Sequence, residues 1–265
     1  MDILRQSMAP LSGNAWEEIN EQARRYFRSF LSARRFLEIS GPHGWAYPAA
    51  PTGRLTVPEG QDNEPVRYGV HNVQPLVETR ASFTIDIWEM DNITRGLRDP
   101  DFSSLEAAAR EAAAFEERAV YQGFAKGGIS GLVESSGHEA VALGDTAEEM
   151  LQAVSRAVPL FVYSGVEGPY SLVLDRKHWQ QLSTYVNGYP LRDHIKKLIG
   201  GEIILSNAVD VNVVLSTRGG DFELVLGQDL SIGYEMHDTK TVRLYFTESF
   251  TFQVLDPDAV IVLNA

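Results

Sequence analysis

The sequence predicts an α+β fold, in which helices and mostly antiparallel strands follow one another without a repeating β-α-β order. Two segments, which begin near Asn14 and near Ser104, carry apolar residues at steps of three and four, the spacing of one helix face. The last third instead alternates apolar and polar residues over 222–226 and 242–254, the spacing of half-buried strands. Because no strand-helix-strand rhythm links these parts, the sequence does not favour a doubly wound parallel sheet.

The first helix is expected to start at Asn14, with Glu17 as the reciprocal acid, and to run for about 20 residues. Its apolar stripe includes Trp16 and Ala23, and arginines lie beside that stripe. Residues 1–36 carry a net charge of +2 in a chain whose net charge is −13, which leaves −15 on the rest. A basic amphipathic helix can anchor to a membrane, bind a partner or expose a solvated back, and the pattern leaves these three interpretations open.

Residues 52–91 are predicted to be mostly extended, with a polar turn at 59–63. Pro65 and Pro75 argue against a buried central strand over that length, because proline cannot donate to a strand ladder. A long two-stranded hairpin is not stable alone in water. We therefore expect it to lie against something else, and another chain is one candidate.

The strongest helix is predicted at 104–125, opened by a capping box of Ser103 and Glu106 and ended by Gly127 and Gly128. The middle of the chain is predicted to hold a helix at 146–157 that starts at Asp145 or Thr146, a strand at 171–174, and helices at 177–182 and 191–199.

The composition is that of a soluble globular protein. The 265 residues are 44% hydrophobic and 22% charged, which fits one large domain or two modest ones. The chain has no cysteine, which excludes disulfide scaffolds, thiolate metal sites and cysteine nucleophiles. No secretory signal segment or membrane-spanning run is visible, and the net charge of −13 disfavours nucleic acid and anionic lipid. We expect a cytoplasmic protein that binds neither nucleic acid nor membrane.

The motifs of common enzyme classes are absent from the sequence. There is no G-x-G-x-x-G or G-x-x-x-x-G-K-[ST] loop for phosphate, and no H-E-x-x-H pair for zinc. The six histidines lie more than four residues apart, so we predict no metal site. Glu116 and Glu117 are adjacent and diverge on a helix, which favours a solvated face over a catalytic pair. The prediction is that the protein is not an enzyme.

Several short motifs occur in an order that is typical of one family. They are Met1–Leu4, Ala9–Leu11, Arg34–Phe36, Gly41–Tyr47, Pro75–Leu76, Phe83–Ile85, Glu167–Tyr170, Gly188–Leu191, Arg218–Phe222, Leu226–Tyr234 and Glu248–Val254. Together they identify the chain as similar to the encapsulin shell proteins of the linocin-like family. The resemblance covers nearly the whole length of the sequence.

This resemblance implies the fold of tailed-phage major capsid proteins, with a peripheral (P) domain, an axial (A) domain and an extended (E) loop. It divides the chain into an N-terminal arm and first P-domain strand (1–48), the E-loop (49–80), the P-domain with its long helix (81–130), the A-domain (131–223) and C-terminal P-domain strands (224–265). It implies a closed icosahedral shell of 60 copies that encloses cargo such as a peroxidase or a ferritin-like protein. The alternatives are a prophage-derived major capsid protein and, less favoured, a bacteriocin or protease.

The resemblance also implies a cargo site, at which a short terminal targeting peptide of the cargo docks. Its residues here would be Phe27, Phe30, Leu31, Arg34, Phe36, Glu38, Leu76, Asp229, Leu230 and Ile232. An apolar groove with one arginine and two carboxylates at its rim suits an extended peptide with Leu or Ile anchors and a basic residue. The alternative is that these are ordinary core residues between helix and sheet. Glu38 stands where family members often have Asp.

Two further sites follow from the resemblance. A fivefold pore would be lined by Thr184, Tyr185, Asn187, Gly188 and Tyr189, whose small and polar composition suits the passage of ions and small molecules. No cofactor is required, although some relatives bind a flavin, which could stack on Trp88. The alternative for Trp88 is an aromatic residue that packs across strands.

Overall fold

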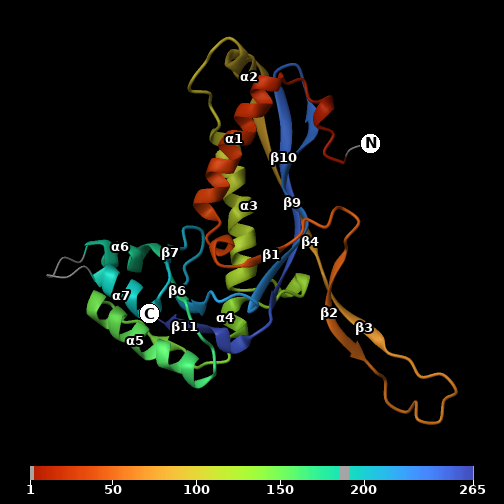
Figure 1. Ribbon diagram of the computed structural model, residues 1–265. Coiled ribbons are helices and arrows are strands. Elements are labelled where there is room, and N and C mark those ends of the chain that lie inside the picture. Colours follow the sequence, from red (N-terminus) through yellow and green to blue (C-terminus); the bar gives the residue numbers. More distant parts are fainter. Residues whose placement is uncertain (1–2, 185–190, 265) are drawn as a thin grey trace.

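The computed structural model describes residues 3–184 and 191–264. It has three parts, which are seen side by side in Figure 1. One part is a long twisted sheet covered by two helices. The second is a smaller sheet with three helices around it. The third is a two-stranded hairpin that projects away from both.

The long sheet has the strand order β1-β9-β10-β4. Its strands are β1 (Glu38–Ser40), β4 (Val77–Asp86), β9 (Phe222–His237) and β10 (Thr241–Val254). β10 pairs antiparallel with both β4 and β9, whereas β1 is parallel to β9. The period-two pattern therefore predicted real strands, and β9 extends eleven residues beyond the predicted stretch at its carboxyl end.

Two helices cover this sheet, α1 (Gly13–Phe30) and α3 (Ser103–Tyr121), and they lie side by side in Figure 1. Their apolar stripes form one core with β4 and β10, which includes Ile19, Leu105 and Phe83. Phe27 of α1 meets Phe246 of β10 edge to face, with the ring centroids 5.0 Å apart. The periodic apolar spacing of both helices is thus explained by burial against the sheet.

The starts of these helices differ from the prediction. Ser12, not Asn14, caps α1, and its Oγ accepts a hydrogen bond from the Ala15 N–H at 3.2 Å. α3 begins at Ser103 without a side-chain cap. Glu106 accepts instead from Gln22 Nε2 at 3.0 Å, which links α3 to α1. The predicted capping box is therefore wrong, because a contact between helices takes its acid.

Residues 87–94 are helical rather than extended. They form α2 (Ile87–Thr94), whose N-cap Asp86 accepts from the Glu89 N–H at 3.1 Å. Trp88 lies on this short helix and is 71% exposed, so it does not pack across strands.

The smaller sheet has the order β5-β11-β8-β6-β7. Its strands are β5 (Val141–Ala142), β6 (Tyr170–Leu174), β7 (Ile203–Leu205), β8 (Val213–Ser216) and β11 (Val260–Asn264). The helices beside it are α5 (Ala147–Tyr163), α6 (Arg176–Thr184) and α7 (Leu191–Ile199). Thr146 caps α5 in a capping box with Glu149, as one of the two predicted starts requires.

One segment of the C-terminus lies in a different part from the one predicted. β11 pairs antiparallel with β8 and parallel with β5, so the chain ends in the smaller sheet and not with β9 and β10. Its residues Val260, Ile261 and Leu263 are buried. Val260 and Ile261 point to opposite faces of the strand and are both buried, so the sheet is covered on both faces at β11.

The projecting hairpin consists of β2 (Ala49–Thr56) and β3 (Val70–Pro75). It ends at Pro75, because β4 starts at Val77 and pairs with β10, so residues 77–80 belong to the long sheet and not to the hairpin. The remaining short elements are η1 (Gln6–Met8), η2 (Ala33–Arg35), η3 (Ala125–Gly127), α4 (Leu132–Ser135) and η4 (Pro257–Ala259).

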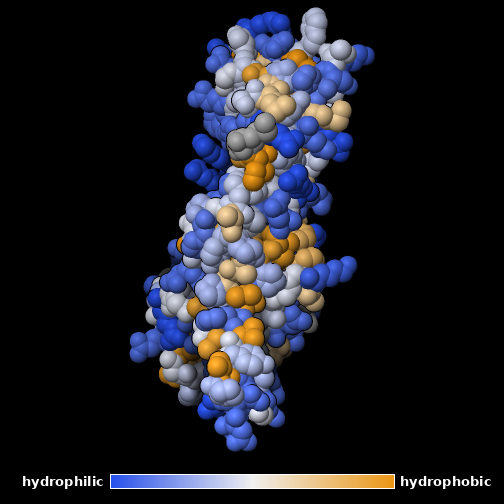
Figure 2. All heavy atoms as spheres, turned by 90° about the vertical axis from the view of Figure 1, so that its right-hand side faces the viewer, coloured by the Kyte–Doolittle hydropathy of each residue, from blue (hydrophilic) through white to orange (hydrophobic). Residues whose placement is uncertain are grey.

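The hairpin exposes apolar side chains along much of its length. The residues that are more than half exposed are Leu55, Val57, Val66, Tyr68, Val70 and Val73. Figure 2 turns this side of the molecule toward the viewer, and apolar patches break the polar surface in its lower half, at the height of the hairpin in Figure 1. A row of exposed apolar residues on a projecting element is typical of an interaction surface.

Candidate functional site

A groove runs between α1 and β9 and consists of two adjoining hollows of about 590 and 240 Å³. Arg24, Phe27 and Leu230 line both hollows. The other residues of the larger hollow are Arg28, Leu31, Arg34, Arg35 and Asp229, and those of the smaller one are Leu4, Gln6, Asn20, Ala23, Ser231, Ile232 and Phe246. We call this feature the α1–β9 groove.

The groove has an apolar floor and a positively charged border. Phe27 and Leu31 are buried in the core beneath it, and Leu230 is half-buried at its wall. Leu230 is held in place because its N–H donates to Asp229 Oδ1 at 2.8 Å. The floor can receive an apolar side chain of a ligand, while the arginines at the border meet its polar groups.

Six of the ten predicted peptide-binding residues line this groove. They are Phe27, Leu31, Arg34, Asp229, Leu230 and Ile232. Arg34 and Asp229 among them lie 195 positions apart in sequence, and α1, η2 and β9 bring the six residues together.

The other four, Phe30, Phe36, Glu38 and Leu76, do not line the groove. Phe30 is buried between helices, stacked on Tyr26 at 6.2 Å and covered by Arg110. Phe36 packs against Tyr121 and Phe222.

Glu38 lies in β1 of the long sheet, and Leu76 lies between the end of β3 and the start of β4. Glu38 lies on β1 opposite Glu223, and a Cβ added at Gly219 would stand 2.8 Å from its Oε1. Leu76 lies beside Gly227, where an added Cβ would be 2.8 Å from its Cδ2. In the single chain Phe30 is buried in the core, Phe36 and Leu76 are half-buried, and Glu38 is exposed.

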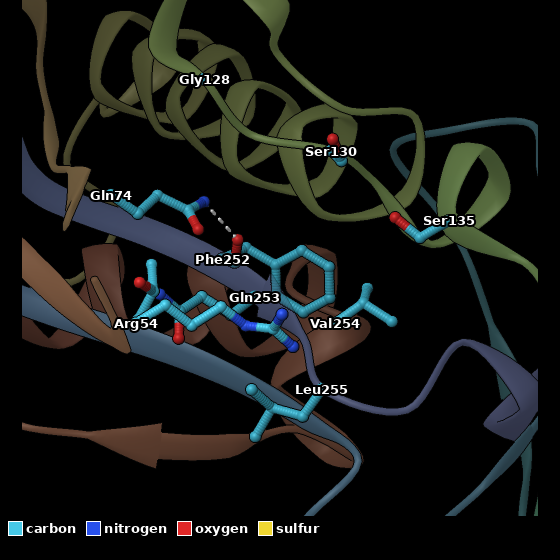
Figure 3. A pocket seen from close by; sticks show the side chains of 10 residues that line it. Arg54, Gln74, Gly128, Ser130, Ser135, Phe252, Gln253, Val254 and Leu255 are labelled. Atoms are coloured by element: carbon cyan, nitrogen blue, oxygen red, sulfur yellow. Dashed lines mark hydrogen bonds between the residues drawn. The ribbon is translucent and has the colours of Figure 1, made fainter. Parts of the chain in front are cut away.

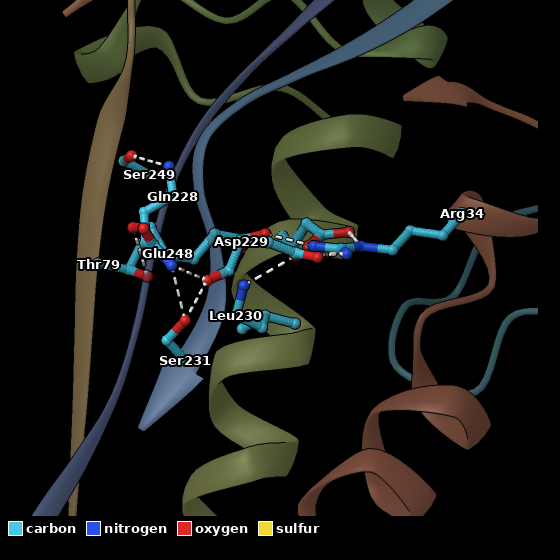
Figure 4. A network of polar contacts seen from close by, with 9 residues as sticks. Arg34, Thr79, Gln228, Asp229, Leu230, Ser231, Glu248 and Ser249 are labelled. Atoms are coloured by element: carbon cyan, nitrogen blue, oxygen red, sulfur yellow. Dashed lines mark hydrogen bonds and ion pairs between the residues drawn. The ribbon is translucent and has the colours of Figure 1, made fainter. Parts of the chain in front are cut away.

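Arg34 is not a free cation at the border but the centre of an ion cluster, which is drawn in Figure 4. Its Nε and Nη2 donate to the two carboxylate oxygens of Glu116 at 2.9 and 2.6 Å. Its Nη1 donates to Asp229 Oδ1 at 2.8 Å, and Nη2 also contacts Glu248. Glu116 and Glu248 are each 1% exposed, so the prediction of a solvated Glu116 is wrong.

The cluster sets three carboxyl groups against one guanidinium. Burial, and then the neighbouring Glu116 carboxylate, raise the pKa of Glu248 well above its ordinary value. Burial opposes the charge of Arg34, but the hydrogen bond and charge of Glu116 outweigh it and keep the pKa of Arg34 above its ordinary value. Burial beside Glu116 therefore favours the neutral form of Glu248.

Glu117 belongs to a second buried network and is likewise not solvated. It is fully buried, and it accepts hydrogen bonds from the Ser32 hydroxyl and from the Ala33 N–H, the latter at 2.8 Å. The Tyr121 hydroxyl lies 2.8 Å from Ser32 Oγ. Burial raises the pKa of Glu117 to about 7, despite these donors.

Sequence reasoning missed the roles of the three buried glutamates. Glu248 was visible as the one charged residue that interrupts the apolar positions of 242–254, but its partner Arg34 lies 214 positions away. Glu116 and Glu117 gave no such signal, because their partners come from η2 and the residue before it.

The surroundings of Trp88 fit a flavin poorly. A hollow of about 360 Å³ adjoins this residue and is lined by Asp86, Glu89 and Asp101 together with neutral residues. None of its described lining residues is a lysine or arginine that would bind a flavin phosphate. The exposed indole could stack on a flat ring, but the three carboxylates disfavour an anionic cofactor.

The predicted pore segment falls largely outside the described residues. Thr184 is the last residue of α6, and its hydroxyl donates to the Gln180 carbonyl at 2.9 Å. Tyr185, Asn187, Gly188 and Tyr189 lie outside the described residues.

A fourth hollow, of about 300 Å³, opens where the hairpin joins the long sheet, as Figure 3 shows. Arg54, Ser130, Ser135 and Gln253 are among its lining residues. Gln74 of β3 donates from Nε2 to the Phe252 carbonyl at 2.7 Å and so fixes the base of the hairpin to β10. The lining is more polar than that of the α1–β9 groove.

Within residues 3–184 and 191–264, no group of three or more His, Asp or Glu side chains could hold a metal ion. None of the helices in this part of the chain is long and apolar enough to cross a membrane.

Comparison with known proteins gives consistent results for sequence and structure. The profile of the family described as "Encapsulating protein for peroxidase" matches residues 1–251. The chain is 38% identical over 264 residues to the type 1 encapsulin shell protein of Rhodococcus erythropolis, covering 99% of this chain and 100% of that protein. The virus-like particle of Pyrococcus furiosus has a TM-score of 0.68 at 18% identity, covering 94% of this chain and 99% of that one.

A phage capsid has the same architecture. The capsid protein of Myoviridae phage XM1 superimposes with a TM-score of 0.53 at 13% identity, and the match covers 88% of this chain and 91% of that one. This similarity shows the capsid fold alone, whereas the full-length match to the Rhodococcus erythropolis protein shows the family. The chain therefore belongs to the encapsulins, a family of shell proteins with a structural rather than a catalytic role.

Proposed function

We propose that this chain assembles into a closed icosahedral shell of 60 copies in the cytoplasm, and that the α1–β9 groove docks a targeting peptide of an enclosed protein. The hairpin β2–β3 carries the assembly proposal, because its apolar residues have no cover within the described part of the chain. The groove carries the docking proposal through its apolar floor of Phe27 and Leu31 and its apolar wall at Leu230. Since the matching family is described as encapsulating a peroxidase, a peroxidase is the proposed cargo, and a ferritin-like protein is the alternative that the resemblance implies.

The physical argument for a closed shell starts from the hairpin. A surface that sticks out from one copy and meets a different surface on the next gives a head-to-tail contact. Such contacts close into a finite particle when the rotation between copies closes. We propose that contacts between copies of the chain bury the exposed apolar residues of the hairpin. Electron micrographs of the purified protein, reconstructed with icosahedral symmetry, would give the number of copies directly.

Replacing both Leu55 and Val57 by Lys is expected to prevent shell assembly and to leave the fold of the single chain intact. Both side chains are more than half exposed and flank Gly69; Leu55 lies in β2, Val57 directly follows that strand, and Gly69 directly precedes β3. Burial of each contributes roughly 1 to 2 kcal/mol in every copy, and a lysine would add the cost of burying a charge. Size-exclusion chromatography with light scattering measures the particle mass.

Thr56→Lys serves as the control, because residue 56 is the intervening position and points to the opposite face of the strand. We expect shells from this variant. Shells of normal size from the Leu55→Lys/Val57→Lys variant would show that this face makes no contact between copies.

Leu230→Asp is expected to give intact shells that enclose little cargo. Leu230 is half-buried and lines both hollows, so a carboxylate there would place a charge at the apolar floor of the groove. Loading should fall at least tenfold, about 1.4 kcal/mol per docked peptide. The ratio of cargo to shell protein in purified particles measures it. Phe30 and Ile232 are unsuitable for this test, because they are 7% and 4% exposed and an Asp would damage the core.

Met236→Asp is the matched control for Leu230→Asp. Met236 is exposed near the end of the same strand and lines neither hollow. It should retain normal loading, and equal loading of the two variants would argue against docking in the groove.

The proposal includes no resident cofactor, in keeping with the acidic surroundings of Trp88. The visible absorbance of cargo-free shells would reveal a bound flavin.

A further inference from the structure

One polar side chain is buried at the end of the hairpin, where nearly every other side chain is exposed. We call the segment 57–69, which connects β2 to β3, the hairpin tip. Gln61 is 7% exposed and is the one buried residue of the stretch 51–73, all of which the structure describes. A polar side chain takes up such a position when hydrogen bonds compensate for its burial. The burial of Gln61 therefore indicates a structural task within the tip.

The Gln61 amide closes the hairpin tip through three hydrogen bonds. Its Oε1 accepts from the Tyr68 N–H at 2.7 Å, and its Nε2 donates to the Tyr68 carbonyl at 3.0 Å and to the Pro58 carbonyl at 2.8 Å. The pairing of β2 with β3 ends at Thr56 and Val70, so it does not reach these backbone groups. One side chain thus takes the place of the strand ladder and ties both ends of the tip together.

The residue that this amide holds carries part of the exposed apolar surface of the tip. Tyr68 is 59% exposed, and Val66, two positions earlier, is 76% exposed. Because Gln61 binds both the N–H and the carbonyl of Tyr68, it fixes the direction in which the ring leaves the backbone. A tip without these bonds would sample many conformations and would lose that freedom on joining a shell. A surface that is ordered in advance avoids this loss.

We infer that Gln61 is a positioning residue for shell assembly: it orders the hairpin tip, so that Tyr68 and Val66 meet a neighbouring copy in one arrangement. This inference rests on the proposed role of the hairpin in assembly and assigns one residue a part in it. Gln61 makes no contact with the neighbour, because its amide is buried and acts through Tyr68. Loss of the amide should therefore weaken association between copies and leave the rest of the fold intact.

Gln61→Glu tests the inference with almost no change in shape. A carboxylate can still accept from the Tyr68 N–H, but it cannot donate to the carbonyls of Pro58 and Tyr68 and is repelled by them. We expect the protein concentration at which half of the chain is in shells to rise about tenfold at pH 8, which corresponds to about 1.4 kcal/mol per copy. Light scattering measures this concentration after the chain has been dissociated in denaturant and returned to buffer by dilution.

Acidification gives a readout that a change in packing alone would not move. Protonation of the introduced carboxyl restores one donor, so the tenfold difference between Gln61→Glu and the native protein should shrink to about threefold at pH 5. The other charged residues of the tip are Glu59, Asp62, Glu64 and Arg67, and Arg67 Nη2 lies 3.6 Å from Asp62 Oδ1. These residues are the same in both proteins, so the comparison removes their contribution.

Asn63→Asp is the matched control, because it makes the same change from amide to carboxylate two positions away. Asn63 is exposed, and its side chain has no hydrogen bond to any part of the chain that the structure describes. We expect this control to assemble at the same concentration as the native protein. Tryptophan fluorescence monitors the fold of each variant, because none of the four tryptophans lies in the hairpin.

Hydrogen exchange tests the order of the tip directly. Exchange of the backbone amides of 57–69 is compared between unassembled chains, at protein concentrations below those at which shells form. It should be roughly tenfold faster in Gln61→Glu than in the native chain, because the amide no longer closes the tip. Equal exchange in the two chains would show that Gln61 does not order this segment.

The outcomes separate the inference from the function on which it rests. If Leu55→Lys/Val57→Lys forms normal shells, the hairpin face makes no contact between copies and the proposed role of the hairpin is wrong. If that variant fails to assemble while Gln61→Glu assembles like the native protein, the role of the hairpin is correct and the positioning role of Gln61 is wrong. If Gln61→Glu and Asn63→Asp weaken assembly equally, added charge and not the lost amide is the cause, which also overturns the inference.

Discussion

Replacing Arg34 by Met is expected to lower the free energy of unfolding by about 3 to 5 kcal/mol. The variant would leave Glu116 and Glu248 buried next to one another, with the only guanidinium of the described cluster removed. Breaking one partner of a buried ion pair costs this much because the remaining charge has lost its counter-ion but has not regained water. Denaturant unfolding of purified shells, followed by tryptophan fluorescence, measures the change.

A compensated variant keeps this prediction falsifiable if Arg34→Met does not fold. The triple variant Arg34→Met/Glu116→Gln/Glu248→Gln removes the buried charges together, leaves only the partly exposed Asp229, and retains groups of similar size. It should recover most of the lost stability, since the penalty comes from unpaired charge and not from the missing side chain. If the triple variant is as unstable as Arg34→Met, packing of the arginine and not charge is what holds this region together.

Glu117 is expected to make the protein less stable as the pH rises from about 4.5 to 7. Its pKa in the folded chain is about 7, against an ordinary value of 4.5, so the folded state holds a proton that the unfolded state releases. The stabilising contribution is complete below pH 4.5 and is lost as the pH rises through 7. A pKa difference of this size corresponds to about 3 kcal/mol.

Glu117→Gln isolates this contribution, because glutamine keeps the shape and stays neutral at every pH. The groups that face Glu117 are the Ser32 hydroxyl, the Ala33 N–H, Tyr121 and the neighbouring Glu116. The stability difference between the native protein and the variant should change by about 3 kcal/mol between pH 4.5 and 8. Thermal or denaturant unfolding across that range measures it, and parallel curves for the two proteins would contradict the raised pKa.

The fold class and most helices could be predicted because they depend on periodicity, which is local. The first turns of the helices could not, because several residues can cap a helix and tertiary contacts choose between them. Ser12 and Asn14 are both residue types that cap helices well. Ser12 is the cap in the structure, where its Oγ also lies 2.8 Å from Thr94 Oγ1, a tertiary contact that supports this position. Trp88 was misread because Ile85 to Trp88 alternates like a strand, while the capping role of Asp86 needs only the next three residues.

The candidate site could be predicted in part. Apolar positions such as Phe27 and Leu230 were identified through the resemblance, and the structure places them at the groove. Charges were harder, because a guanidinium near a carboxylate in space is invisible in sequence when 82 or 195 positions separate them. Arg34 was therefore predicted as a ligand for a peptide, although its donors are taken by the chain itself.

The groove joins two segments that are made at very different times. Phe27 and Arg34 leave the ribosome long before β9, and Asp229 lies 195 positions after Arg34. No docking surface can exist on a growing chain that has not yet reached Leu230, however well its first helix has formed. The docking that we propose for this groove would therefore begin only after synthesis has passed β9, so that translation would set the order in which a filled particle is built.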